Sequence, residues 1–344
     1  MARKQVQIVV DGTPVTVSNL DKVLFPDDGF TKGDLINYYI RISQTLLPYL
    51  RDRPLSLRRY PDGIHGPHFW EKDAPEHKPD FVPTWPYQVE EKGRGVIHLM
   101  MANNLPTLVW IANLASIDVN PWLSRIDKPN YPDQVVFDLD PFEPATFADT
   151  LEISMLVKGV LDRLGLVGYP KTSGKTGMQI FVPIRRRFPY EQTRAFVEAV
   201  AAMIYHAYPE KITWEWAIRL RTGKIRIDYT QNVLGKTIAS VYSVRARPGA
   251  PVSTPLRWEE VARGGFVPRD FKITNIFDRL QREGDLFAPV LHEPQDISEA
   301  LVALGLRPGR KQGAQPPEEL LPARGRVAVP RRLSRPPPSC SHCQ

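Results

Sequence analysis

Residues 134–140 read Gln134-Val135-Val136-Phe137-Asp138-Leu139-Asp140, the pattern of an apolar β-strand that ends in two carboxylates. Because residues i and i+2 of a strand face the same side, Asp138 and Asp140 are expected to project together while Leu139 points into a packed layer. Two carboxylates about 5 Å apart repel by roughly 3 kcal/mol at an effective dielectric of about 20. A divalent cation between them would offset this repulsion. The stretch therefore predicts either a metal site or a solvated strand end.

A third candidate carboxylate, Asp228, closes a second short strand predicted over residues 225–229. Basic residues crowd the approach to it, and Arg226 shares a strand face with Asp228. Three converging carboxylates suit Mg²⁺ or Mn²⁺ and phosphoryl transfer. Cations beside them suit a triphosphate or a DNA backbone, although such a cluster can also be a solvated charged face.

The overall charge says little about partners. The formal net charge is +7, but the segment from Arg307 onward has eight basic and two acidic residues, which leaves about +1 for the preceding 306 residues. Local basic clusters in the body must therefore carry any nucleic-acid argument. They occur at residues 51–59, 185–187 and 219–226.

Cysteine usage and hydropathy indicate the compartment. The only two cysteines, Cys340 and Cys343, lie near the C-terminus, so the body has no disulfides, as expected in a reducing cytoplasm. We find neither a signal-peptide pattern nor a long apolar run. These observations predict a cytoplasmic protein without a membrane partner.

Hairpin patterns alternate with single helices along the chain, and no internal repeat is present. This mixture predicts an α+β fold with mixed or antiparallel sheets rather than a doubly wound parallel sheet. Residues 1–300 are expected to form one domain, and residues 301–344, rich in Pro and Arg, a disordered tail. Further predicted strands cover residues 5–10, 14–17, 55–60, 87–91, 95–100, 178–183 and 236–243, and predicted helices cover residues 31–46, 105–114, 147–164, 190–208 and 297–304.

The segment Ser173-Gly174-Lys175-Thr176-Gly177 contains the Gly-Lys-Thr of a P-loop but fails the other requirements of that motif. A P-loop needs a glycine five residues earlier, where Tyr169 stands, and a following helix, whereas residues 178–183 have a β pattern. Two glycines and small hydroxyl residues still let backbone N–H groups approach an anion, with Lys175 as a further donor. The segment predicts either a phosphate-binding loop or an ordinary hairpin turn.

Six motifs in a fixed order carry a family resemblance. They are Ser18-Asn19-Leu20-Asp21-Lys22-Val23-Leu24-Phe25-Pro26, Phe69-Trp70-Glu71-Lys72, Val136-Phe137-Asp138-Leu139-Asp140-Pro141, Thr172-Ser173-Gly174-Lys175-Thr176-Gly177, Ile227-Asp228-Tyr229-Thr230-Gln231-Asn232, and Lys236-Thr237 through Tyr242-Ser243-Val244-Arg245-Ala246. Over residues 17–289 the sequence resembles the polymerase domain of bacterial LigD-type non-homologous end-joining proteins, in the archaeo-eukaryotic primase superfamily. The resemblance implies a primase-like fold with packed helices around one active-site cleft.

The resemblance also implies roles for the candidate site. Asp138, Asp140 and Asp228 would hold two divalent ions, Mn²⁺ or Mg²⁺, that align a primer 3′-hydroxyl with the α-phosphate of an incoming nucleotide. Family members often prefer ribonucleotides and Mn²⁺. The residues implied to bind the nucleotide are Ser173, Gly174, Lys175, Thr176, Gly177, Gln179, Gln231, Lys236 and Arg245.

Two further groups match the family's DNA contacts. Asn19, Lys22 and Lys32 would bind the 5′-phosphate on the far side of a gap or break, with Lys32 beside a predicted helix N-terminus. Phe69 and Trp70 would lie in a loop and stack on DNA bases, which is worth about 1–3 kcal/mol per base. Packing in the core is the alternative for Trp70.

Three positions depart from the commoner family pattern. Gln179 and Asn120 stand where many members have histidine, and Lys175 falls one place early in its loop. A glutamine can bond a phosphate or sugar but cannot carry charge. These departures put nucleotide affinity and metal preference in question, while the three carboxylates remain.

The resemblance implies a primase-polymerase that extends ends and fills gaps with NTPs or dNTPs during double-strand break repair, in the cytoplasm and associated with the nucleoid. Because the chain has no Lys-x-Asp-Gly ligase motif, we expect a stand-alone polymerase that works with Ku and a separate DNA ligase. The alternatives are a gap-filling polymerase of excision repair, a catalytically weak DNA-end-bridging module, and a carboxylate-metal nuclease or phosphoesterase.

Overall fold

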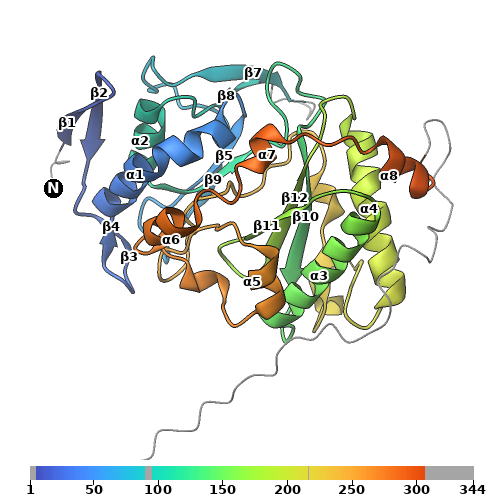
Figure 1. Ribbon diagram of the computed structural model, residues 1–344. Coiled ribbons are helices and arrows are strands. Elements are labelled where there is room, and N and C mark those ends of the chain that lie inside the picture. The colour runs from blue at the N-terminus through green and yellow to red at the C-terminus, as the bar shows by residue number, and fades with distance from the viewer. Residues whose placement is uncertain (1–4, 90–94, 216, 307–344) are drawn as a thin grey trace, which may run out of the picture.

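The strand that carries Asp138 and Asp140 lies inside a four-stranded antiparallel sheet (Figure 1). The computed structural model describes residues 5–89, 95–215 and 217–306. The order of strands in the sheet is β11 (Tyr169–Thr172), β12 (Met178–Pro183), β10 (Gln134–Pro141) and β13 (Ile225–Ile227).

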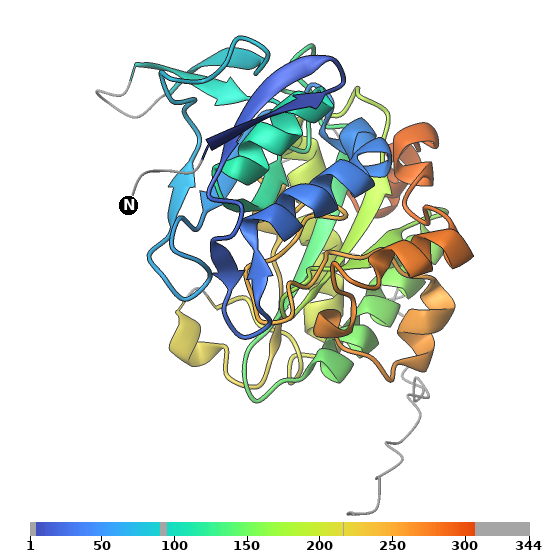
Figure 2. The same ribbon diagram turned by 90° about the vertical axis from the view of Figure 1, so that its left-hand side faces the viewer.

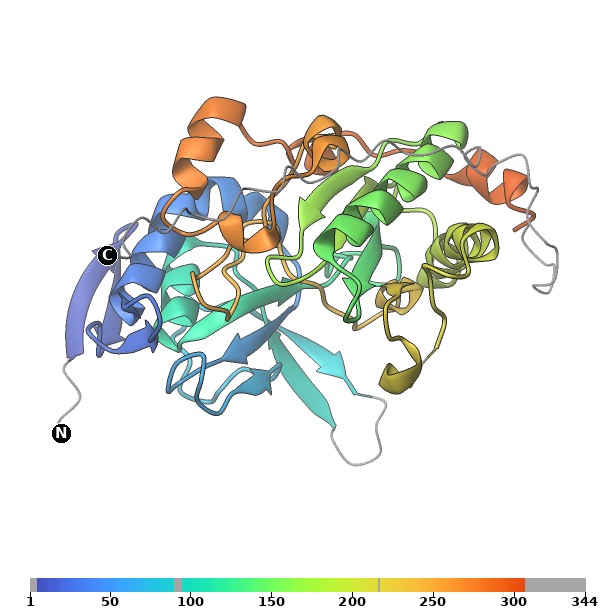
Figure 3. The same cartoon turned by 90° about the horizontal axis from the view of Figure 1, so that it is seen from below.

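The two faces of this sheet differ because side chains alternate along β10. Val135, Phe137 and Leu139 are fully buried on the face that packs against helices. Those helices are α3 (Phe147–Arg163) and α4 (Tyr190–Ala207), and Figure 3 shows both on that side of the sheet. Burying each such side chain stabilises the fold by about 1.5–3 kcal/mol. The apolar residues thereby fix the register and leave Asp138 and Asp140 on the opposite face.

Local sequence signals set the ends of the long helices. Thr31 caps α1 (Lys32–Leu50), and its side chain and that of Asp34 form a capping box. Thr146 does the same for α3, and Gly165, at φ 69°, follows the end of that helix. These caps explain why the predicted starts of both helices are confirmed.

The N-terminal half covers the polar side of the sheet. The hairpin β1–β2 packs on α2, and α2 packs on α1; Figure 2 shows these elements side by side. A second antiparallel sheet has the order β6-β5-β9. The bounds are β1 (Gln5–Val10), β2 (Thr13–Ser18), β3 (Val23–Phe25), β4 (Phe30–Thr31), β5 (Leu55–Arg59), β6 (Phe69–Glu71), β7 (Thr84–Gln88), β8 (Val96–Met100), α2 (Leu105–Asn113) and β9 (Ser116–Pro121).

The C-terminal part consists of short helices and irregular chain. The helices are α5 (Trp258–Arg263), α6 (Ile276–Glu283), α7 (Pro289–His292) and α8 (Ser298–Ala303), with short 3₁₀ turns at Ile218–Leu220, Tyr229–Gln231 and Pro268–Asp270. Val241, Val244 and Val252, from the irregular chain before α5, are buried in the N-terminal core. The segment therefore ties the two halves of the molecule together.

Two predictions about local structure are wrong. Residues 236–243 do not form a strand: the segment bonds to β9 only at intervals, with Ile238 N donating to Pro121 O at 3.3 Å and Ser240 N to Val119 O at 3.0 Å. The segment has the apolar pattern of a strand because it is buried on both sides. Phe69 and Trp70 lie in strand β6 rather than in a loop, since they pair with Arg59 and Arg58 of β5.

The fold class is confirmed as α+β with antiparallel sheets. The predicted domain boundary at residue 300 stays a prediction, although α8 runs across it and Leu301 and Leu304 are buried. Residues 307–344 of the predicted tail lie outside the described residues, as do residues 90–94 between β7 and β8. Within the described ranges, none of the helices combines the length and apolarity that crossing a membrane requires.

Candidate active site

A row of polar side chains crosses the sheet face opposite α3 and α4. Asp138 of β10 pairs with Gln179 of β12, which pairs with Lys171 of β11. The Gln179 amide nitrogen donates to Asp138 Oδ1 at 3.0 Å, and the Lys171 ammonium donates to Gln179 Oε1. Burial lowers the pKa of Lys171 well below its usual range. In its charged form Lys171 can only donate, which sets the Gln179 amide with its nitrogen toward the aspartate. The buried ammonium also donates to Ala239 O at 3.0 Å and to Ser253 Oγ at 2.6 Å.

The two strand-end carboxylates resist ionisation. Burial, together with the neighbouring Asp140 carboxylate, raises the pKa of Asp138 well above its usual range. Burial and the carboxylate of Asp228 raise the pKa of Asp140, and Arg226 opposes that shift. Like charges held close on a buried face are stabilised by an added cation. The donor set is all oxygen, which suits Mg²⁺ or Mn²⁺.

Asp228 is next to this pair through its backbone, since its N–H donates to Asp138 O at 2.7 Å. Its carboxylate instead accepts hydrogen bonds from Thr230 Oγ1 at 2.5 Å, Arg226 Nη2 at 3.3 Å and Gln231 Nε2 at 3.3 Å. Consequently no three His, Cys, Asp or Glu side chains converge on a metal position in the part of the chain that the structure describes. Two carboxylates face the site directly, and Asp228 can add a third only by turning away from Thr230.

The glycine-containing segment is the turn between β11 and β12. Ser173 Oγ accepts from the N–H groups of Lys175 at 3.2 Å and Gly177 at 3.0 Å, so these two amides are used within the turn. Gly174 has φ 72°, and a Cβ there would lie 2.5 Å from Arg245 Cγ. A Cβ on Gly177 would lie 2.1 Å from Leu139 O. Both glycines are therefore needed to bring the turn against β10, and phosphate binding by the turn stays a prediction.

The remaining residues predicted to bind the nucleotide lie in three places. Arg245 is buried and donates to Ser173 O at 2.8 Å, so it joins the turn. Gln231 instead donates a hydrogen bond to the Asp228 carboxylate. Thr176 and Lys236 are exposed, and Lys236 precedes Thr237, which forms a bridge with Trp122.

The three residues predicted to bind a 5′-phosphate lie together at the start of α1. Lys22 N donates to Asn19 O at 3.1 Å, and Lys32 N donates to Lys22 O at 2.8 Å. Lys32 is only 5 % exposed, and its ammonium donates to Ser18 Oγ at 3.3 Å and Asn113 O at 3.2 Å. The first-turn amides of α1 bond within the protein, so side-chain cations must do the binding. Lys22 forms an ion pair with Asp62 at 2.7 Å, and a phosphate would have to displace that carboxylate.

Phe69 and Trp70 are 46 % and 53 % exposed, so core packing is excluded for Trp70. Arg58 Cζ lies 5.6 Å from the centre of the Trp70 ring, and Arg59 Cζ lies 5.2 Å from the centre of the Phe69 ring. Large apolar side chains at an edge strand, each beside an arginine, suit nucleic-acid bases and backbone.

Sequence reasoning missed three residues of the site: Asp118, Lys171 and Asp62. Asp118 is a buried carboxylate that contacts Lys175 and Arg245. An aspartate two residues before Asn120, in a buried strand, was the signal that could have identified it. Lys171 and Asp62 have no comparable signal, because their partners are distant in the sequence.

Comparison with solved structures identifies the class of fold. The structure resembles the polymerase domain of Mycobacterium tuberculosis ligase D, solved in complex with DNA, with a TM-score of 0.76 and 28 % identity over 82 % of this chain and 99 % of that one. The fold is therefore that of the LigD polymerase domain, of the archaeo-eukaryotic primase type.

A family model described as "LigD, primase-polymerase domain" matches residues 31–287. The chain belongs to the LigD primase-polymerase domain family, whose members serve DNA repair by non-homologous end joining. It is 34 % identical over 280 residues to the bifunctional LigD protein of Bacillus subtilis and 31 % identical over 278 residues to the multifunctional LigD protein of Mycolicibacterium smegmatis. These matches cover 81 % and 80 % of this chain but 44 % and 36 % of those proteins.

Proposed function

We propose that this chain is a metal-dependent nucleotidyltransferase that extends primer ends and fills short gaps with NTPs or dNTPs during non-homologous end joining. The observation that carries the proposal is the pair Asp138 and Asp140 on one polar sheet face, with the Lys175 and Arg245 cations beside the adjoining turn. Acidic side chains next to buried cations suit a triphosphate with its metal ions better than they suit a free carboxylate or sugar.

The proposed roles follow from position. Asp138, Asp140 and a reoriented Asp228 would hold two Mn²⁺ or Mg²⁺ ions, which supply activation of the 3′-hydroxyl and charge stabilisation at phosphorus. Gln179, locked by Lys171, orients the Asp138 carboxylate. Lys175 and Arg245 contribute positive charge to the triphosphate, and Ser173 shapes the turn that places them. Lys236, whose side chain is exposed, would contact the nucleotide from the solvent side of the site.

The DNA would lie along the face that carries Trp70 and the start of α1. Phe69 and Trp70 stack on bases, and Asn19, Lys22 and Lys32 hold the 5′-phosphate beyond the gap. Residues 1–300 would form the primase-polymerase domain. The relatives are named as end-joining proteins, and we infer that the partners are broken DNA, Ku and a separate ligase, in the cytoplasm at the nucleoid.

Primer extension on a gapped duplex tests the proposal. The substrate has a 5′-phosphate across the gap, and Mn²⁺ is supplied with rNTPs or with dNTPs in separate reactions. We expect extension that stops when the gap is filled. Binding without extension in either mixture would contradict the polymerase assignment and favour an end-bridging module, and degradation of the primer would favour a nuclease.

The Asp62 carboxylate competes with the phosphate for Lys22. Asp62→Asn should therefore tighten binding of a 5′-phosphorylated gap up to about fivefold, since an exposed ion pair is worth about 0–1 kcal/mol. Fluorescence anisotropy with phosphorylated and hydroxyl-ended gaps measures the effect. Asp27→Asn is the matched control, because Asp27 is an exposed carboxylate that pairs with His65 instead. An equal gain in both variants would mean that only the net charge matters.

Trp70 should contribute to DNA affinity and not to folding. Trp70→Ala is expected to weaken binding of gapped DNA by about 1–3 kcal/mol, with little change in melting temperature because the ring is half exposed. Trp70→Phe keeps an aromatic face and should keep most of the affinity. A lower melting temperature with unchanged DNA binding would show that the residue is structural.

A further inference from the structure

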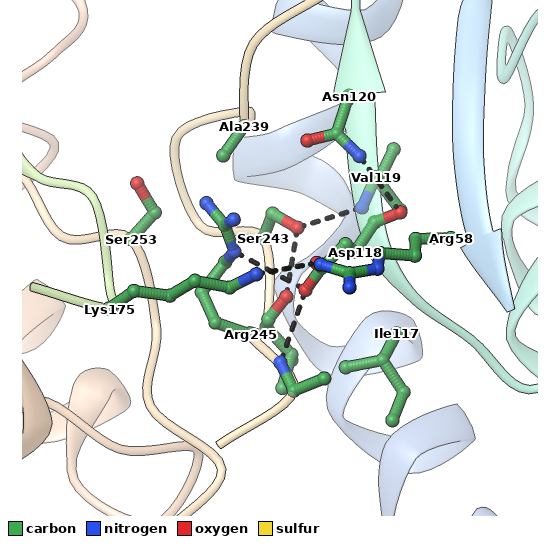
Figure 4. Close-up of polar contacts among 12 residues, drawn as sticks. Arg58, Ile117, Asp118, Val119, Asn120, Lys175, Ala239, Ser243, Arg245 and Ser253 are labelled. Atoms are coloured by element: carbon green, nitrogen blue, oxygen red, sulfur yellow. Dashed lines mark hydrogen bonds and ion pairs between the residues drawn. The ribbon is translucent and has the colours of Figure 1, made fainter. Parts of the chain in front are cut away.

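Asp118 is the most deeply buried carboxylate near the proposed nucleotide site, at 1 % exposure. Figure 4 shows Lys175, Arg245 and Arg58 pointing toward it from three different parts of the chain. Its oxygens lie 3.2 Å from Lys175 Nζ, 3.3 Å from Arg245 Nε and 3.9 Å from Arg58 Nη1. The N–H of Ala246 also donates to it, at 3.1 Å. One carboxylate thus holds three cations that would otherwise repel one another.

The same carboxylate is connected to the proposed DNA-stacking strand. In the sheet β6-β5-β9, Arg58 pairs with Trp70 on one side and with Asp118 on the other. The three side chains therefore lie in one row across the sheet. Arg58 is in contact with Asp118 at one end of this row and lies over the Trp70 ring at the other. Because Arg58 contacts both residues, a displacement of the Trp70 ring by DNA would move Arg58 relative to Asp118 and so change the field on the other two cations.

We propose that Asp118 is a positioning residue that sets Lys175 and Arg245 for the triphosphate and, through Arg58, couples nucleotide binding to DNA binding at Trp70. The inference rests on the proposed function. Asp118 itself would not touch the nucleotide, because its oxygens are occupied by these donors and its charge is opposite to what a phosphate requires. A buried carboxylate in this place is explained if it orders the cations.

The protonation of Lys175 agrees with this role. Burial and the nearby Arg245 lower the pKa of Lys175 to about 8, while Asp118 raises it and Arg58 lowers it further. Burial works against ionisation of Asp118, but Arg245 and Lys175 outweigh it and hold the pKa of this carboxyl below its usual range. Lys175 is charged below its pKa, so triphosphate affinity should fall as the pH rises through about 8. Without the Asp118 charge, that fall should move to lower pH.

The sign of the effect of Asp118→Asn distinguishes positioning from simple charge. Removing a negative charge beside a phosphate site would, by Coulomb attraction alone, tighten triphosphate binding. If Asp118 orders the cations and keeps Lys175 protonated, the same change weakens binding. The amide keeps the size of the carboxylate, so packing changes little.

The test measures nucleotide dissociation constants with a primer that lacks a 3′-hydroxyl, so that nothing is incorporated. A labelled nucleotide is titrated with and without saturating gapped DNA, and the ratio of the two constants is the coupling factor. We expect the wild-type protein to bind the nucleotide several-fold more tightly with DNA. Asp118→Asn should weaken nucleotide binding about tenfold, bring the coupling factor close to one and shift the loss of affinity to lower pH.

Two further variants keep the inference open to refutation if Asp118→Asn does not fold. Arg58→Gln, on a partly exposed side chain, should bring the coupling factor close to one. Arg59→Gln is the matched control, because Arg59 pairs with Glu71 and lies over Phe69 instead, and it should preserve the coupling factor.

Tighter or unchanged nucleotide binding in Asp118→Asn, or an unchanged coupling factor in Arg58→Gln, would overturn the inference. A wild-type protein that binds no nucleotide would instead overturn the proposed function. The two failures are therefore distinguishable.

Discussion

Asp138→Ala is expected to abolish primer extension, with a fall in rate of about 10³-fold or more. Each factor of ten in rate corresponds to about 1.36 kcal/mol of barrier, and the charge stabilisation supplied by a correctly held metal ion amounts to several kcal/mol. The Asp138 carboxylate accepts a hydrogen bond from Gln179, and its backbone carbonyl accepts one from the N–H of Asp228, so both its side chain and its strand are fixed beside the other two carboxylates. Single-turnover extension of a gapped duplex measures the loss.

The Asp138 carboxylate should destabilise the protein when no metal ion is bound. Asp138 and Asp140 repel each other on a buried face, so Asp138→Asn should raise the melting temperature without metal by about 2–4 °C per kcal/mol of relieved repulsion. The wild-type protein should gain stability on adding Mn²⁺, by about 2.7 kcal/mol at one hundred times the dissociation constant. Asp138→Asn should lose most of that gain.

A matched control separates this effect from a general loss of negative charge. Asp162, on α3, is an exposed carboxylate paired with Lys158. Asp162→Asn should leave both extension and the Mn²⁺-dependent rise in melting temperature unchanged. Full extension by Asp138→Ala, or an undiminished Mn²⁺ effect in Asp138→Asn, would remove Asp138 from the metal site.

The central strand could be predicted because its signal is local. Alternation along residues 134–140 requires only that Val135, Phe137 and Leu139 be buried, and the structure buries all three. The same is true of the starts of α1 and α3, which were expected near residues 31 and 147; the structure shows that each is held by a capping box whose two members are three residues apart. Interactions over so short a span do not depend on how the two halves of the molecule meet.

The contacts that arrange the site could not be predicted in this way. Arg245 and Asp118 are 127 residues apart in the sequence, and Lys171 and Ser253 are 82 apart. Both depend on the irregular segment before α5, which was expected to be a strand over residues 236–243. The segment is buried on both sides, so its apolar residues are not confined to one face. A buried strand has the same apolar pattern, and the sequence therefore does not distinguish the two.

A sequence can also nominate a charged residue without revealing what neutralises it. Lys22 was expected to meet a phosphate, and the structure pairs it with Asp62. Asp228 was expected to face a metal ion, and its carboxylate bonds to Thr230. A buried or half-buried charge without its ligand takes the nearest partner of opposite charge or a hydrogen-bond donor. The partners therefore become visible only in the folded chain.

The combined change Lys22→Ala and Lys32→Met should erase the preference for phosphorylated gaps. Two charge-assisted contacts to a phosphate are worth about 1.5–3 kcal/mol each, so we expect the phosphorylated gap to bind at least about 100-fold more weakly. The hydroxyl-ended gap should bind almost as before. Methionine replaces Lys32 because this side chain is buried and its aliphatic part packs where alanine would leave a cavity.

The ratio of the two dissociation constants, measured by anisotropy at one salt concentration, isolates this contribution. Loss of any surface lysine weakens binding to both gaps through the general attraction to the backbone, and the ratio removes that common effect. Lys158→Ala is the control that should leave the ratio unchanged, because Lys158 on α3 pairs with Asp162 and not with any residue proposed to bind the phosphate. If the double variant still prefers the phosphorylated gap, the phosphate is bound elsewhere. If the wild-type protein shows no preference, no 5′-phosphate site exists at the start of α1.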